Sequence, residues 1–179
     1  SILRSELSFI LRETTLPVKV TLPGPMTVAD STADEFYHNE EQLAMDVAVA
    51  LNKEALELEQ QGAAVIQFDE PVFSRYPEKV VSWGIKALDR CLEGLSTAKS
   101  AAHICYSYPM PGVPRPIVDS YPVILEALES SKVDELALEF EASKLDPSLL
   151  RRCPSKTVLF GCIDNGTNEI ENPRDIANK

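Results

Sequence analysis

Short apolar runs alternate along this chain with longer segments in which apolar residues recur at helical spacing. Short runs bounded by turn residues are typical of β-strands, and a period of three to four residues is typical of amphipathic helices. The predicted strands cover 17–22, 63–68, 100–105, 133–140 and 156–164. The predicted helices cover 40–62, 78–95, 116–131 and a short segment at 146–152. The predicted order is therefore β-α-β-α-β-α-β-α-β.

Three of these segments carry more detailed expectations. In the first helix, which Gly62 should end, the predicted apolar stripe consists of Leu43, Val47, Ala50, Leu51 and Leu58. The strand at 63–68 is an unbroken apolar run, so we expect it to be buried on both faces. Pro122 is expected to break the first turn of the helix at 116–131.

Alternating strands and helices indicate parallel strands with right-handed crossovers, in either an open doubly wound sheet or a (β/α)8 barrel. No glycine-rich phosphate motif follows a predicted strand, which removes the main support for a dinucleotide-binding sheet. Polar side chains instead follow several strands, as the catalytic face of a barrel requires, so we predict an α/β fold of the (β/α)8 TIM barrel class. Five strands cannot close such a barrel, and the chain opens on Ser1 without a methionine. We therefore expect residues 1–179 to be one partial catalytic barrel domain, incomplete at both ends.

Composition narrows the class of partner. The chain has 179 residues, 44% of them hydrophobic and 25% charged, and a formal net charge of -11. Such a charge repels phosphate backbones and anionic lipid surfaces, so we expect small-molecule substrates and neither nucleic acid nor membrane. No apolar run is long enough to span a bilayer, and residues 1–17 lack the pattern of a signal peptide. Four widely spaced cysteines do not suggest a disulfide framework, and we expect a cytoplasmic protein with reduced thiols.

His103 and Cys105 stand two positions apart at the end of a predicted strand. Residues i and i+2 of a strand project from the same face, about 6 to 7 Å apart along the chain, which suits two corners of a tetrahedral zinc site. On spacing alone, a buried histidine near a buried thiol is the more common explanation of such a pair.

Acidic residues end two other strands. Glu139 follows an apolar run, where an ionised carboxylate is costly unless it is paired or binds a metal, although a salt bridge would also explain it and Glu141 is a rival ligand. Asp69 and Glu70 could hold a substrate ammonium group, or could stabilise the start of a helix. Asp164 ends the last strand and is a further candidate for substrate binding.

Five blocks occur in order at these strand ends: "KVTLPGP", "AAVIQFDEP", "HICYS", "LALEF" and "GCIDNGTNEIENP". Together they resemble the carboxy-terminal catalytic domain of cobalamin-independent methionine synthases and their single-domain relatives, within the uroporphyrinogen decarboxylase and methionine synthase-like superfamily. The resemblance runs from about residue 17 to residue 173. It implies a (β/α)8 barrel with a catalytic zinc that presents a thiol substrate to an alkyl donor.

The resemblance also implies roles for single residues. The zinc ligands would be His103, Cys105 and Glu139, and Asp69 would contact the amino group of a homocysteine-like thiol. A second cysteine ligand belongs to an "Asp-Cys-Gly" stretch that would come after residue 179. We accordingly expect Cys162 to be a packed core thiol, and residues 1–179 alone to bind zinc weakly or not at all.

One departure from the family pattern keeps the substrates open. Methionine synthases carry a histidine shortly after the aspartate of the last block, where this chain has Asn165, Gly166 and Thr167. The first hypothesis is methyl transfer from 5-methyltetrahydrofolate to homocysteine. The alternatives are thiol-to-epoxide or other thiol alkyl transfer, and a non-catalytic fragment that cannot hold zinc.

Overall fold

The computed structural model describes residues 1–106, 117–164, 166–168 and 170–179, and its framework is one parallel sheet with strand order β1-β2-β3-β4-β5. The strands are β1 Lys19–Pro23, β2 Val65–Asp69, β3 Lys99–Ile104, β4 Glu135–Glu139 and β5 Thr157–Gly161. The α-helices are α1 Arg4–Glu13, α2 Pro25–Asp30, α3 Glu40–Gln61, α4 Pro77–Lys79, α5 Ile85–Cys91, α6 Tyr121–Glu129 and α7 Pro173–Ala177. Two 3₁₀ segments, η1 Pro71–Ser74 and η3 Pro147–Arg152, and a π segment, η2 Val80–Gly84, complete the elements.

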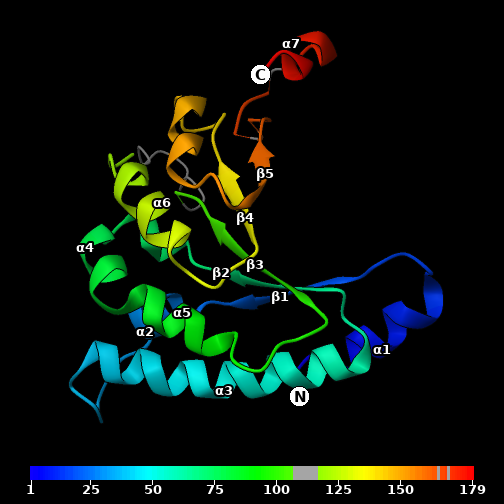
Figure 1. Ribbon diagram of the computed structural model, residues 1–179, viewed down its shortest axis with the longest axis vertical. Coiled ribbons are helices and arrows are strands. Elements are labelled where there is room, and N and C mark those ends of the chain that lie inside the picture. The colour runs from blue at the N-terminus through cyan, green and yellow to red at the C-terminus, as the bar shows by residue number, and fades with distance from the viewer. Residues whose placement is uncertain (107–116, 165, 169) are drawn as a thin grey trace.

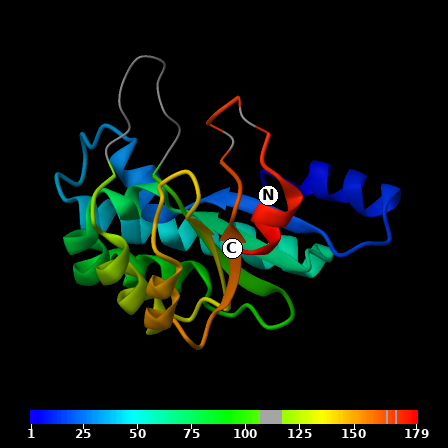
Figure 2. The same cartoon turned by 90° about the horizontal axis from the view of Figure 1, so that it is seen from above.

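All four strand pairs are parallel and join strands that are consecutive in the chain, as the sequence predicted. Helices α2 to α6 cover one face of the sheet, and these helices leave the opposite face uncovered (Figure 1). This is the arrangement of the (β/α)8 barrel class, of which the described residues supply five strands. Figure 2 shows the same layers from above, with α3 running beneath the strands.

Successive side chains along each strand point alternately to the face that the helices cover and to the uncovered face, called the open face below. In β2, Ile66 and Phe68 are fully buried, whereas Val65, Gln67 and Asp69 remain half-buried. The expectation that this strand is buried on both faces is therefore wrong, because helices cover only one face of the sheet. The open face carries the odd-numbered residues of β2, β3 and β4.

The buried stripe of α3 also differs from the prediction. Its small residues Ala44, Ala48 and Ala55 are buried, while Ala50 is exposed and Leu58 is the only predicted stripe residue that is buried. Helix α3 packs against α2 and α5, and alanine side chains allow helices to approach closely. The predicted stripe was chosen from large apolar side chains. It is therefore rotated about the helix axis relative to the stripe that is buried in the structure.

Proline acts differently at two helix starts. Pro122 does not break a helix but stands in the first turn of α6, where its missing N–H has no intrahelical partner to lose. Pro25 likewise opens α2, a short helix that the pattern did not reveal. Helices α1 and α7 were also missed. Among the described residues, no helix is long and apolar enough to cross a membrane.

Candidate active site

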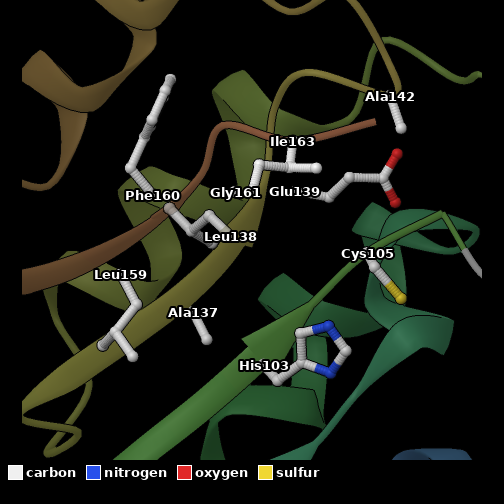
Figure 3. A pocket seen from close by; sticks show the side chains of 10 residues that line it. All are labelled: His103, Cys105, Ala137, Leu138, Glu139, Ala142, Leu159, Phe160, Gly161 and Ile163. Atoms are coloured by element: carbon white, nitrogen blue, oxygen red, sulfur yellow. The ribbon is translucent and has the colours of Figure 1, made fainter. Parts of the chain in front are cut away.

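A pocket of about 380 Å³ opens at the carboxyl ends of β3, β4 and β5. It combines one imidazole, one thiol and one carboxylate with an otherwise apolar wall (Figure 3). The lining residues are His103, Cys105, Ala137, Leu138, Glu139, Ala142, Leu159, Phe160, Gly161 and Ile163. The pocket therefore brings together the three residues that the sequence singled out as zinc ligands.

Asp69 lies beside this pocket and holds the ring of His103. The two residues are paired in the register of β2 and β3, and Asp69 Oδ1 is 3.2 Å from His103 Nδ1. Gln67 Nε2 donates to the same oxygen at 2.9 Å. The hydrogen bonds to Asp69 and then to Cys105 raise the pKa of His103 to about 10, because both favour the charged imidazolium. Asp69 thus lies beside the pocket without lining it, with about a third of its side chain exposed.

The carboxylate of Glu139 is held by its own surroundings. Oε2 accepts the backbone N–H of Tyr106 at 3.1 Å, and the hydroxyl of Ser143 donates to Oε1. Glu141 points elsewhere, since its carboxylate pairs with Lys144 at 2.8 Å and Lys179 at 2.9 Å. Of these two acidic residues, Glu139 and not Glu141 lines the pocket, as predicted.

The three predicted ligands share the pocket but do not meet at one point. In Figure 3 the His103 ring and the Glu139 carboxylate lie on opposite sides of the Cys105 side chain. Within the described ranges, no three His, Cys, Asp or Glu side chains are close enough together to hold a metal ion. The prediction that His103, Cys105 and Glu139 converge at ligand distance is therefore wrong for this arrangement, while their assignment as zinc ligands stays a prediction.

The chemistry of the donors nevertheless suits zinc. Neutral imidazole, thiolate and carboxylate are the three ligand types that zinc sites use. Asp69 occupies Nδ1 of His103, which leaves Nε2 for a metal, an arrangement common among ligating histidines.

Glu70 is not open to a substrate, although it follows Asp69 directly. It is completely buried, and its carboxylate accepts the N–H groups of Met26 and Thr27, both at 2.9 Å, and the Thr27 hydroxyl at 2.6 Å. Burial raises the pKa of Glu70 to about 7 despite these donors. Successive residues of an extended chain point to opposite sides, so Asp69 faces the site while Glu70 caps α2. Of the two alternatives for this acidic pair, stabilisation of a helix start applies to Glu70, and substrate binding by Asp69 stays a prediction.

The last strand places its candidates away from the pocket. Asp164 is not a lining residue: its Oδ2 is 4.0 Å from Lys144 Nζ, and its N–H donates to Glu171. Cys162 is half-buried and follows the end of β5, so the expectation of a packed core thiol below the strand end is wrong. Gly161 and Ile163 line the pocket, which puts Cys162 on the other side of the chain.

Sequence inspection missed the residues that orient the site. Ser143 lies in the turn after β4, and no periodicity marks it as the partner of Glu139. Tyr121 begins α6, yet its hydroxyl donates to Ile104 O at 3.1 Å, seventeen positions away. A buried tyrosine needs a hydrogen-bond partner, but sequence does not say which carbonyl supplies it.

Comparison with known proteins gives one consistent result. Residues 8–179 match the family described as cobalamin-independent synthase, catalytic domain. The methionine synthase of Thermococcus kodakarensis is 32% identical over 161 residues, which are 89% of this chain and 44% of that protein. A methionine synthase of Saccharolobus islandicus is 33% identical over 163 residues, covering 90% of this chain and 45% of the relative.

A solved structure shows the same relationship. The B12-independent methionine synthase from Shewanella sp. W3-18-1, in complex with selenomethionine, superposes with a TM-score of 0.91 at 36% identity. The match covers 99% of this chain and 54% of that one. The chain thus spans about half the length of the relatives that it matches.

Proposed function

Because this chain belongs to the family of cobalamin-independent synthase catalytic domains, we propose that it takes part in zinc-dependent methyl transfer to a thiol. The proposed acceptor is homocysteine and the proposed donor is 5-methyltetrahydrofolate, both small molecules. His103, Cys105 and Glu139 would hold the zinc. The cytoplasm is the compartment that we propose for this reaction, since it keeps thiols reduced.

The observation that carries this proposal is the meeting of an imidazole, a thiol and a carboxylate in one pocket at three adjacent strand ends. Zinc bound there supplies one chemical effect, which is to lower the pKa of a substrate thiol so that its sulfur is nucleophilic at neutral pH. In the transfer, a bond forms between this sulfur and the methyl carbon while the bond from that carbon to the folate nitrogen breaks. The thiol proton ends on the folate nitrogen.

The protein's own residues bind and orient the reactants. Both described contacts of Asp69 fall on Oδ1, and we assign Oδ2 to the ammonium group of the amino-acid thiol. The apolar side of the pocket includes Leu159 and Ile163, which are 40% and 57% exposed, so their burial by the bound reactants would exclude water from the reacting sulfur. Proximity of the two substrates is the main contribution that such a pocket can make.

One sequence feature favours a second candidate, thiol-to-epoxide or another thiol alkyl transfer. Gly166 and Thr167 stand where the family's methionine synthases carry a histidine, and Asn165 lies outside the described residues. A histidine there would serve as an acid toward the folate, and a donor that needs no such acid would not require it. The thiol half of the reaction is common to both candidates.

The test measures zinc and methyl transfer in the purified protein. Protein in which residues 1–179 form part of a complete barrel, the wild type of this test, should contain zinc in proportion to protein and convert homocysteine with 5-methyltetrahydrofolate. Residues 1–179 alone are expected to bind zinc weakly or not at all. Cys105→Ser should lose both, while Cys162→Ser should keep both, because Cys162 lies outside the pocket. Zinc without methyl transfer, together with activity toward an epoxide, would favour the second candidate. Absence of zinc in the wild type would favour a non-catalytic fragment.

A further inference from the structure

The strand end that carries His103 and Cys105 is fixed from behind by a buried tyrosine. Tyr121, 1% exposed, donates its hydroxyl to Ile104 O at 3.1 Å. Ile104 stands between the two predicted ligands and faces the helices, so this bond restrains the peptide that connects them. The hydroxyl reaches this carbonyl from the first residue of α6.

The ring of Tyr121 connects this strand end with the next one. It stacks on Tyr106, with centroids 5.3 Å apart and planes at 15°, and meets Phe140 edge-on at 5.7 Å and 80°. Tyr106 directly follows Cys105, and Phe140 directly follows Glu139. One side chain therefore contacts the neighbours of a thiol donor on β3 and a carboxylate donor on β4.

The alternating directions of successive side chains explain why the contacts of the Tyr121 ring with Tyr106 and Phe140 lie behind the pocket. Cys105 and Glu139 line the open face, and the residues after them point to the helix side, where both are buried. Phe140 continues the contact to Phe160 of β5, at 4.8 Å between centroids. An aromatic row thus runs along the ends of all three strands that form the pocket, with Tyr106, Tyr121 and Phe140 behind it and Phe160 in its lining.

We propose that Tyr121 is a positioning residue for the metal-ligand set His103, Cys105 and Glu139, acting through the Ile104 carbonyl and through the rings of Tyr106 and Phe140. This inference rests on the proposed function, because it assumes that these residues bind zinc. Groups that orient metal ligands contribute about 10- to 100-fold in metal affinity. In the described arrangement Tyr121 restrains the strand ends from which the donors extend, and the donor atoms themselves do not meet at one point. Tyr121 touches none of the donor atoms in its described hydrogen bonds, so its effect is on their placement.

The primary test compares Tyr121→Phe with Asn52→Leu in the purified protein. Tyr121→Phe keeps the ring and removes the hydroxyl. Asn52→Leu is a stability control, since buried Asn52 also donates to backbone carbonyls, Cys91 O at 2.9 Å and Glu93 O at 2.7 Å, in the helical layer away from the pocket. Both variants should lower the melting temperature. Only Tyr121→Phe should weaken zinc binding, by about tenfold or more in competition with a chelating dye.

Cobalt gives a spectroscopic measure of the same effect. In Co²⁺-loaded protein, Tyr121→Phe should shift the d–d and sulfur-to-metal bands, and Tyr121→Leu, which also removes the ring, should shift them further. Asn52→Leu should leave the bands unchanged. Equal zinc affinity and equal spectra in wild type and folded Tyr121→Phe would overturn the proposal.

A metal-free measurement separates this inference from the proposed function. The rate of alkylation at Cys105, measured by peptide mass spectrometry relative to Cys162, should rise several-fold in Tyr121→Phe because the strand end opens more often. It should not rise in Asn52→Leu. If wild-type protein with a complete barrel binds no zinc, the proposed function fails, and this ratio alone decides whether Tyr121 fixes the strand end. An unchanged ratio would show that it does not.

Discussion

His103 Nδ1 and Asp69 Oδ1 lie 3.2 Å apart across two strands whose register pairs these same residues. The contact joins a predicted metal ligand to a predicted substrate-binding residue. Asp69 Oδ1 also accepts a hydrogen bond from Gln67 Nε2 at 2.9 Å. Because Gln67 belongs to β2 as well, a neighbour on the same strand helps to orient the Asp69 carboxylate. The candidate metal site and the candidate substrate site are therefore one hydrogen-bonded unit, and substitutions of Asp69 should affect both.

The metal-free protein should hold a protonated His103 at neutral pH. Its pKa is raised to about 10 by the hydrogen bonds to Asp69 and Cys105. The folded state therefore gains stability from this proton fully below pH 6.5 and loses it as pH rises through about 10. Asp69→Asn should lower the pKa, which an NMR titration of the ring measures. The same titration in a His38→Gln protein identifies the signal, and an unchanged pKa in Asp69→Asn would contradict the assignment of the cause.

Zinc binding should release this proton, because only a neutral imidazole nitrogen coordinates a metal. We expect zinc affinity to increase as pH is raised from 6 toward 9 and proton release to accompany zinc addition in a weakly buffered solution. Asp69→Asn should reduce the number of protons released. Zinc affinity that is independent of pH over this range would argue against coordination by His103.

Asp69 should also distinguish thiols by their amino group. In wild type, homocysteine should bind more tightly than the same thiol without its amino group, by a factor of about 10 or more for one charge-assisted hydrogen bond. In Asp69→Asn this preference should shrink. Competition binding with the two thiols measures it, and an equal preference in both proteins would remove Asp69 from the ammonium site.

The neighbouring acidic residues Glu139 and Glu141 provide a matched pair. Glu139→Gln should lower zinc affinity by about 100-fold, the upper end of the range for a disturbed zinc site. Glu141→Gln should leave it within about twofold, because that carboxylate pairs with Lys144 and Lys179. Chelator competition on both variants is the measurement. A larger loss in Glu141→Gln would mean that the wrong acidic residue has been assigned to the metal.

Glu70 should make stability depend on pH. Burial raises its pKa to about 7 from the usual 4.5, so the folded state binds the proton more tightly than the unfolded state does. Its contribution is fully present below pH 4.5 and is lost as pH rises through 7, by at most about 3 kcal/mol. Denaturant titrations of wild type and Glu70→Gln at several pH values should show this slope only in wild type. Parallel curves would contradict the raised pKa.

Gly24 has no room for a side chain. A Cβ there would lie 2.2 Å from Cδ of Glu70, whose carboxylate caps α2. Gly24→Ala should lower the free energy of unfolding by about 1 to 3 kcal/mol, as overpacking of a buried site does. Gly166→Ala is the control, since among the described atoms a Cβ there meets only Asp164 Oδ1 at 3.1 Å, and it should change stability by less than about 0.5 kcal/mol. Equal losses of stability in the two variants would show that the Glu70 side chain can move to accommodate a side chain at position 24.

The local pattern of apolar and polar residues was sufficient to predict the strands and the edge of the sheet that carries the candidate site. Each predicted strand has a counterpart in β1 to β5, because short apolar runs between turn residues depend on neighbouring positions alone. Parallel pairing in chain order followed from the alternation with helices. The places of His103, Cys105 and Glu139 at adjacent strand ends were therefore predictable from the sequence.

Contacts between distant segments decided the rest. Asp69 and Glu70 look alike in sequence, but only the packing of α2 against the end of β2 buries Glu70 and leaves Asp69 beside His103. The alanine face of α3 depends on the helices that pack against it, and the orientation of Glu139 depends on Ser143 in the following turn. The sequence by itself determined which donors gather at one edge of the sheet, since strand alternation and order are local properties. Only the tertiary structure decided where each donor points, because that depends on hydrogen bonds and contacts between residues far apart in the chain.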